Sequence, residues 1–284
     1  MDKNSYINSE IVQAFVVWML ARVHTPGIFH HSYTMKKPKK EWECGSLFSA
    51  YENYCWNFRY IDASGKAVSG STFAESDAAL SSLSNSLKES LIQKDNERCI
   101  SACRCILDWG GVKRGNYDKI HALDDKACEY FIHAQSILNT DKDLKWYANT
   151  NLFMSSGFTK IYSLLANDFI IYDSRVGAAL CAFARDFCEE NKSAYIPKEL
   201  CFSWGILRGH DLHNNPRCPD SGQFKFSLIN PHSHLQNNIM ANWLLGELLR
   251  QDTEAFGALP DGKGLRALEA ALFMVGYNVW PLRK

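Results

Sequence analysis

The chain has 284 residues, enough for one large domain or two small ones with a buried core of substantial size. Hydrophobic residues make up 46% and charged residues 22% of the sequence, which is an ordinary globular composition. The formal net charge is +0, which excludes a generally basic nucleic-acid-binding protein, so any DNA contact must use a local basic patch.

The first apolar segment does not predict a membrane span. Residues 11–21 are interrupted by Gln13 and fall short of the roughly 20 apolar residues that a span needs. Asp2 and the lack of a small-residue cleavage pattern argue against a signal peptide. Ten cysteines are scattered through the chain, several inside helical patterns, so we expect reduced thiols in a cytoplasmic protein that does not associate with membranes.

Apolar residues recur at steps of three or four along most of the chain, which predicts an all-α protein of about ten helices. In chain order, the predicted helices lie around residues 11–19, 80–91, 97–109, 125–138, 158–165, 175–190, 235–250 and 263–277. No internal repeat, βαβ rhythm or phosphate-binding glycine pattern is present in the sequence. We predict one domain over residues 1–284, with one helical lobe at about 75–175, a second at about 1–74 and 176–284, and the active site in a cleft between them.

Two segments, residues 25–45 and 204–238, interrupt the helical pattern. The first carries the basic run Lys36–Lys40, which is either a solvated loop or a contributor to salt-dependent DNA affinity. The second is rich in His, Asn, Pro and Gly, but its apolar residues favour an ordered loop. Its histidines match no strong zinc spacing, so we expect no metal and consider Arg208 and His210 as candidate DNA-phosphate contacts.

The most informative stretch runs from Met154 to Leu180. A turn of small residues leads into a helix, and backbone N–H groups at such a turn can meet a phosphate. Lys160 lies at the start of that helix, and Asp173 precedes the next helical run. Asp173 is either a structural helix cap or a catalytic carboxylate at a helix entrance, and Lys160 is either solvated or catalytic.

This stretch resembles the helix-hairpin-helix DNA glycosylases, in which a Gly-containing hairpin grips DNA and an Asp caps a later helix. By position, residues 155–159 match the hairpin, Lys160 matches a Lys that some members carry and Asp173 matches the catalytic Asp. The segments YDSRVGAAL and GLRALEAALFMVGY and the Arg59-x-x-Asp62 step look like the divergent branch named for α-glutamyl/putrescinyl thymine pyrophosphorylases. That branch handles hypermodified phage bases.

The resemblance implies a two-lobed glycosylase that flips a modified base out of duplex DNA and needs no cofactor. Asp173 would stabilise an oxocarbenium-like transition state, and Lys160 would form a Schiff base or contact a phosphate. We expect the base pocket to include Trp56, Asn57, Trp109, Asn116 and Tyr172, although aromatic residues taken singly are more often core residues. Candidate DNA-backbone contacts are Ser155, Ser156, Gly157, Thr159, Arg175, Arg208, His210, Lys36 and Lys37. Arg175 could instead pair with an acid such as Asp173.

The predicted function is therefore a monofunctional, monomeric DNA glycosylase that excises a modified base, such as glucosylated hydroxymethylcytosine, from phage DNA and leaves an abasic site. Two alternatives remain open. A transferase could keep the same fold and pass the base or its substituent to another acceptor. A non-catalytic helical DNA-binding module could use Asp173 only as a cap.

Overall fold

The computed structural model describes residues 1–36, 39–212 and 214–282 and is mainly helical, with 57% helix and 9% strand. The predicted all-α class is thus confirmed only as a mainly-α one, because the structure also contains small sheets. Within the described residues the α-helices are α1 (Lys3–Ile7), α2 (Glu10–His24), α3 (Leu47–Glu52), α4 (Phe73–Gln93), α5 (Asn96–Trp109), α6 (Asn116–His121), α7 (Ala127–Leu138), α8 (Leu144–Ala148), α9 (Ser156–Leu165), α10 (Ser174–Glu190), α11 (Pro231–Gln251) and α12 (Gly264–Val275).

The strands form three two-stranded pairs in the described part of the chain. Two pairs are antiparallel hairpins, and the third is a short parallel pair. The strands are β1 (His31–Lys36), β2 (Lys39–Cys44), β3 (Phe58–Ile61), β4 (Ala67–Gly70), β5 (Ser203–Trp204) and β6 (Ser227–Leu228). Small sheets of this kind leave the core to the helices.

The segment over residues 25–45 was expected to be irregular, and the structure corrects this to a hairpin. Tyr33 on β1 faces Trp42 on β2, and their rings stack at 4.7 Å. Along β1, buried side chains alternate with more exposed ones, as a strand with one covered face requires. Of the basic run, Lys36 ends β1 and Lys39 and Lys40 begin β2, whereas Lys37 lies outside the described residues.

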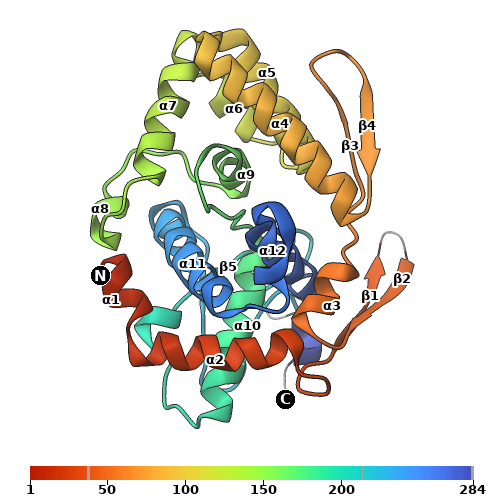
Figure 1. Cartoon of the computed structure of the whole chain (residues 1–284), viewed down its shortest axis with the longest axis vertical. Helices are drawn as coiled ribbons and strands as arrows, with labels where there is room; N and C mark the ends of the chain where they lie inside the picture. Colours follow the sequence, from red (N-terminus) through yellow and green to blue (C-terminus); the bar gives the residue numbers. More distant parts are fainter. Residues whose placement is uncertain (37–38, 213, 283–284) are drawn as a thin grey trace.

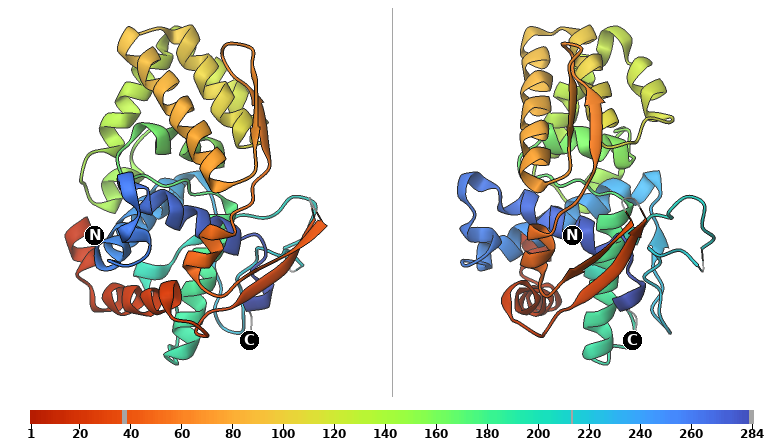
Figure 2. Two further views of the ribbon diagram at one scale, coloured as in Figure 1. Left: turned by 45° about the vertical axis from the view of Figure 1, so that its right-hand side comes forward. Right: turned by 90° about the vertical axis from the view of Figure 1, so that its right-hand side faces the viewer.

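The helices come from distant parts of the chain and pack in two groups. In Figure 1, α4, α5 and α7 stand at one end of the molecule, whereas α2, α3, α10, α11 and α12 fill the other end. Helix α9 packs on α4, α5 and α7. The hairpins lie along one side, and Figure 2 shows β1–β2 beside the loop that follows β5.

Helix α10 is the central element of its group. Every residue from Arg175 to Cys188 is buried, and the helix packs on α2, α12 and β5. Gly177 is required at its first turn, because a Cβ there would collide with the carbonyl oxygen of Ser203 on β5. This tight packing fixes the N-terminus of α10, where Asp173 lies, relative to the rest of the core.

The second irregular segment is ordered in its described residues and ends earlier than expected. Phe224 is buried, while Leu228 on β6 is 38% exposed. Helix α11 already begins at Pro231, because the side chain of Asn230 caps it and proline suits the first helical position. Among the described residues, none of the helices is both long and apolar enough to cross a membrane.

Candidate active site

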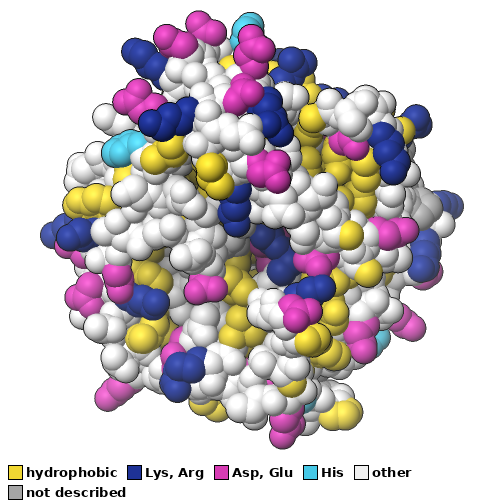
Figure 3. Space-filling model, turned by 45° about the horizontal axis from the view of Figure 1, so that its top comes forward, with side chains coloured by type: hydrophobic (Ala, Val, Ile, Leu, Met, Phe, Trp, Pro, Cys, Tyr) yellow, Lys and Arg dark blue, Asp and Glu magenta, His cyan; other side chains and the backbone are white. Residues whose placement is uncertain are grey.

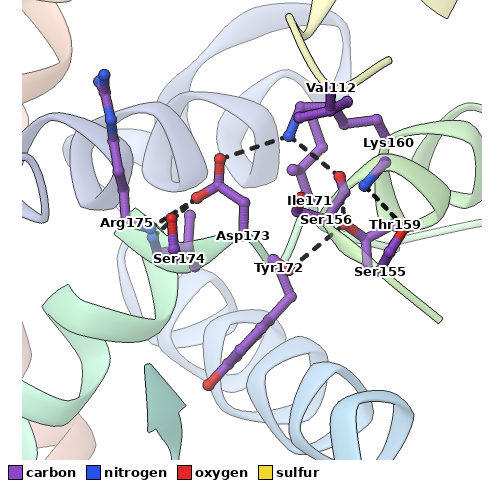
Figure 4. A network of polar contacts seen from close by, with 12 residues as sticks. Val112, Ser155, Ser156, Thr159, Lys160, Ile171, Tyr172, Asp173, Ser174 and Arg175 are labelled. Carbon is purple, nitrogen blue, oxygen red and sulfur yellow. Dashed lines mark hydrogen bonds and ion pairs between the residues drawn. The ribbon is translucent and has the colours of Figure 1, made fainter. Parts of the chain in front are cut away.

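The carboxylate of Asp173 caps α10 from inside the protein. Its Oδ1 accepts hydrogen bonds from the backbone N–H groups of Arg175 at 2.9 Å and Val176 at 3.2 Å. The residue is only 8% exposed, and Figure 4 shows its other oxygen directed toward Lys160. The cap and the positive end of the helix dipole both stabilise the charged form of this carboxylate.

Lys160 on α9 is held against Asp173 and is not solvated. Its Nζ lies 3.4 Å from Oδ2 of Asp173 and donates to the carbonyl oxygen of Ser156 at 3.1 Å. The lysine stem packs on Gly110, where an added Cβ would lie 2.5 Å from the lysine Cδ. Glycine at the end of α5 therefore leaves the space that the buried lysine occupies.

The surrounding cations keep the Asp173 carboxylate ionised. Burial alone raises its pKa, but the positive charges of Lys160, Arg175 and Arg217 outweigh this effect, and the resulting pKa lies below the usual value for Asp. The group is consequently charged at neutral pH. Such a carboxylate can stabilise positive charge that develops on a bound ligand.

The segment before Asp173 is fixed by buried polar contacts. The hydroxyl of Tyr172 donates to the carbonyl oxygen of Ser203 at 2.7 Å. The carbonyl oxygen of Tyr172 lies 2.8 Å from Nε2 of His234 and 3.4 Å from the hydroxyl of Thr159. Burial lowers the pKa of His234, so the imidazole is neutral and donates through Nε2. These contacts limit movement of the catalytic candidate.

A cavity of about 180 Å³ lies against Asp173 and Lys160. Its aromatic walls come from α4, α5, α12 and the segment between α3 and β3, namely Tyr54, Trp56, Phe73, Trp109 and Phe273. Its charged lining consists of Lys160, Asp173, Arg175, Arg217, Arg266 and Glu269. Apolar walls with a few fixed polar groups suit a flat heterocyclic ring such as a nucleobase.

A second carboxylate, Glu269 on α12, borders this cavity. It forms an ion pair with Arg266 at 2.6 Å and accepts a hydrogen bond from the backbone N–H of Ile171 at 2.7 Å. Burial raises the pKa of Glu269 against the opposing effect of Arg266. Glu269 therefore fixes the backbone just before Asp173, and the pKa values of the two carboxylates are shifted in opposite directions.

Arg175 was expected at the DNA backbone, but its buried side chain lines the cavity and is surrounded by three aromatic rings. Its guanidinium carbon is 4.1 Å from the ring centre of Phe273, 4.8 Å from that of Tyr277 and 5.1 Å from that of Trp56. Arg217 lies nearby and donates from Nη1 to the hydroxyl of Ser174. Two buried arginines thus border the same cavity as Asp173.

The predicted base-pocket residues fall into two sets. Trp56 and Trp109 line the cavity. Asn57 is exposed on the surface and does not line it. Tyr172 is fully buried below the site. Asn116 is also buried, where its amide donates to Val112 and accepts from Ser155, so it joins α6 to α9. The placement of the last three residues is corrected, because none of them lines the cavity.

The hairpin residues predicted to contact DNA mostly build the start of α9. The hydroxyl of Ser155 caps the helix by accepting from the N–H groups of Gly157 and Phe158. Gly157 and Thr159 are buried, and Ser156 lines the cavity. The N–H groups of Gly157 and Phe158, which were expected to meet a phosphate, are therefore already bonded to Ser155. The expected phosphate contact is corrected for Ser155, which caps the helix, and for the buried residues Gly157 and Thr159.

The remaining basic candidates lie on a surface that adjoins the site. Arg208 and Lys36 are exposed, and Nζ of Lys36 lies 3.2 Å from Nε2 of His210. The backbone N–H of Lys36 donates to the hydroxyl of Tyr277, whose ring contacts Arg175. Figure 3, a view from another side, shows Lys and Arg side chains interspersed with Asp and Glu around a hollow near the middle of that face.

Several site residues were missed from the sequence. Arg266, Glu269 and Phe273 follow one another at helical spacing on α12, so polar residues interrupting an apolar face were a usable signal. Arg217 lies in an irregular loop, where no periodicity could identify it. Within the described residues, no group of three or more His, Cys, Asp or Glu could hold a metal ion.

Comparisons of the chain with protein-family models, with curated proteins and with solved structures find no match. A function must therefore be inferred from the geometry of this site and from the sequence segments that resemble the glycosylases.

Proposed function

We propose that the protein is a DNA N-glycosylase that excises a modified base from duplex DNA and leaves an abasic site. The observation that carries the proposal is the buried, ionised carboxylate of Asp173 at the end of an aromatic-walled cavity. A base turned out of the duplex would stack among the aromatic rings, with its sugar near Asp173. The substrate class is modified cytosine in phage DNA, in keeping with the resemblance to the bacteriophage replication inhibition DNA glycosylase, and the role is cytoplasmic antiphage defence.

The chemistry follows from the charge at Asp173. When the bond between C1′ and the base breaks, positive charge builds on the sugar, and a fixed carboxylate next to C1′ lowers the energy of that state. The same carboxylate can orient the attacking water. Nζ of Lys160 is engaged by Oδ2 of Asp173 and the carbonyl oxygen of Ser156, so in this proposal the lysine positions the carboxylate and does not act as the nucleophile. The proposed enzyme is therefore monofunctional.

The fold proposal uses the same residues. Short helix α8, the connection over residues 149–155 and α9 would form the helix-hairpin-helix unit. Asp173 caps the next long helix, α10, as the resemblance requires. One lobe would contain α4 to α9, and α1 to α3 with α10 to α12 would form the other. The cavity is lined by residues from both groups.

The test is cleavage of end-labelled duplexes that carry cytosine, hydroxymethylcytosine or glucosyl-hydroxymethylcytosine, analysed on denaturing gels with and without alkali. Wild type should give alkali-dependent breaks at the modified base. Asp173→Asn should reduce the rate by roughly 10²–10³-fold while keeping DNA affinity, because an amide cannot supply the negative charge. The matched control is Asp95→Asn. Asp95 caps α5, and its side chain accepts a hydrogen bond from the backbone N–H of Arg98. This variant should retain wild-type cleavage.

Each other outcome identifies a rival. A modified nucleotide in place of a released base, detected by mass, would indicate a transferase. DNA binding without any reaction, unaffected by Asp173→Asn, would indicate a binding module in which Asp173 is only a cap. Equal cleavage by wild type and Asp173→Asn would contradict the role given to this carboxylate.

A further inference from the structure

One guanidinium nitrogen of Arg175 is buried without a hydrogen-bond acceptor among the described residues. The residue is 9% exposed, and its Nη1 has no acceptor in the described part of the chain. Three rings, those of Trp56, Phe273 and Tyr277, surround it. Rings interact with the face of a guanidinium, whereas its N–H donors lie in its plane. The cation–π contacts therefore leave this donor unsatisfied.

Two neighbours repeat this feature. Nε of Arg217 and Nε1 of Trp109 are also buried donors without an acceptor among the described residues. All three side chains line the cavity that contains Asp173. By contrast, Arg266, the third arginine on this cavity, forms an ion pair with Glu269. A buried donor without an acceptor is unfavourable, and more so when it is charged, so this concentration at one cavity indicates a ligand rich in acceptors.

We propose that Arg175 and Arg217 bind the carbonyl oxygen next to the glycosidic nitrogen of the extruded base, and that they stabilise the negative charge on that base as it leaves. The substrate class is therefore a pyrimidine, whose O2 adjoins N1. This inference rests on the proposed function. It divides the reaction between two groups: Asp173 faces the positive sugar, and the arginines face the negative base.

In this reaction the C1′–N1 bond breaks and its electron pair passes to the base, where the charge spreads over N1 and O2. The arginine N–H groups donate to O2 throughout and transfer no proton. Water adds to C1′ and gives up a proton, and the base anion takes a proton from solvent. The products are an abasic sugar and the neutral free base.

The test compares single-turnover excision and DNA dissociation constants for wild type, Arg175→Met and Arg217→Met. Two duplexes are used, one with the cleavable base and one with its 6-aza analogue, in which the additional ring nitrogen makes N1 a better leaving group. With the ordinary base, Arg175→Met should slow excision by roughly 10²–10³-fold. With the analogue the loss should be clearly smaller, and the dissociation constant should stay within about threefold.

Arg22→Met is the matched control, because Arg22 is also buried and lies over a ring, that of Trp18, at 3.3 Å, but pairs with Glu190. Arg22→Met should lower the thermal midpoint but should not change the ratio of the excision rates of the ordinary base and its 6-aza analogue. Arg175→Met loses the attraction to Asp173 and three cation–π contacts, so its midpoint should fall too, and excision is compared at a temperature at which both variants are fully folded. Folding and chemistry are thereby measured separately.

Three results would overturn the inference. An equal loss of rate with both bases in Arg175→Met would mean that the arginine does not stabilise the departing base. A raised dissociation constant with an unchanged rate would assign Arg175 to a DNA phosphate, the other source of acceptor oxygens. Absence of cleavage by the wild-type protein would contradict the proposed function itself. This outcome is seen in the wild-type reactions alone, before any variant is compared.

Discussion

Asp173 and Lys160 form a buried pair whose members depend on each other. Asp173→Asn leaves the Lys160 ammonium, 4% exposed, with only the Ser156 carbonyl as acceptor. We expect a loss of about 3 kcal/mol in the free energy of unfolding, as is usual when one partner of a buried ion pair is removed. The double variant Asp173→Asn/Lys160→Met should recover part of this loss, because the unpaired charge is gone. Urea denaturation of the wild type, both single variants and the double variant measures the coupling.

Losses that simply add in the double variant would show that the 3.4 Å contact contributes no coupling energy. Lys160→Met alone is informative too. It should lower stability and slow excision less than Asp173→Asn does, because Lys160 acts on the reaction through the position of Asp173.

At single positions, the sequence predicted contacts made along the chain better than contacts made across it. The cap at Asp173 was predictable because its carboxylate accepts from N–H groups that lie only two and three residues further along the chain. The aromatic candidates were not, because Trp109 and Tyr172 are both buried side chains of similar type. Only the packing of distant helices decides that one lines a cavity and the other lies beneath it.

The long helices were predictable because each presents several turns of apolar residues to the core. Helices α1, α3, α6 and α8 were missed, since five or six residues are too few to establish a period. The β1–β2 hairpin was missed for a different reason. Its basic turn and short alternating strands look like a loop until the covered face, formed by Tyr33 and Trp42, is known.

Strand β1 also introduces a pH-sensitive contact between the hairpin and α12. His31 is 1% exposed, with Nε2 at 3.2 Å from the carbonyl oxygen of Val275, and burial lowers its pKa to about 4. In the unfolded chain its pKa is about 6.5, so between these values only the unfolded state binds the proton. Stability should therefore fall as pH drops from about 6.5 to about 4, by up to about 3 kcal/mol.

Urea unfolding of His31→Leu against pH checks this expectation. The variant should lose much of the acid dependence in that window, with the remainder assigned to other buried groups such as His234, whose pKa is also lowered. The neighbouring His30, whose side chain is 66% exposed, provides the control variant His30→Leu, which should follow the wild-type profile. A His31→Leu profile identical to wild type would contradict the assignment.

At the scale of the whole molecule, the chain is neutral, and two of its exposed cations lie on the β1–β2 hairpin and on the loop after β5, which are neighbours in Figure 2. Lys36 on the hairpin and Arg208 on the loop are exposed. The backbone N–H of Lys36 donates to the hydroxyl of Tyr277, and the ring of Tyr277 contacts Arg175, which lines the cavity. Duplex DNA bound at the cavity would therefore pass these side chains. Under the proposed function, the interior of the site would supply the chemistry and these surface cations would contribute to DNA affinity.

This arrangement predicts a specific salt dependence of DNA binding. In the double variant Lys36→Ala/Arg208→Ala, the slope of log K against log salt should fall by about 2, roughly one unit for each DNA phosphate that is no longer neutralised. The excision rate at saturating enzyme should not change, because neither side chain lines the cavity. The control is Lys94→Ala/Arg98→Ala, at the junction of α4 and α5, which lies roughly 20 Å along α5 from Gly110. An equal change of slope in both double variants would mean that the charge effect is general and that the hairpin and loop do not form the DNA path.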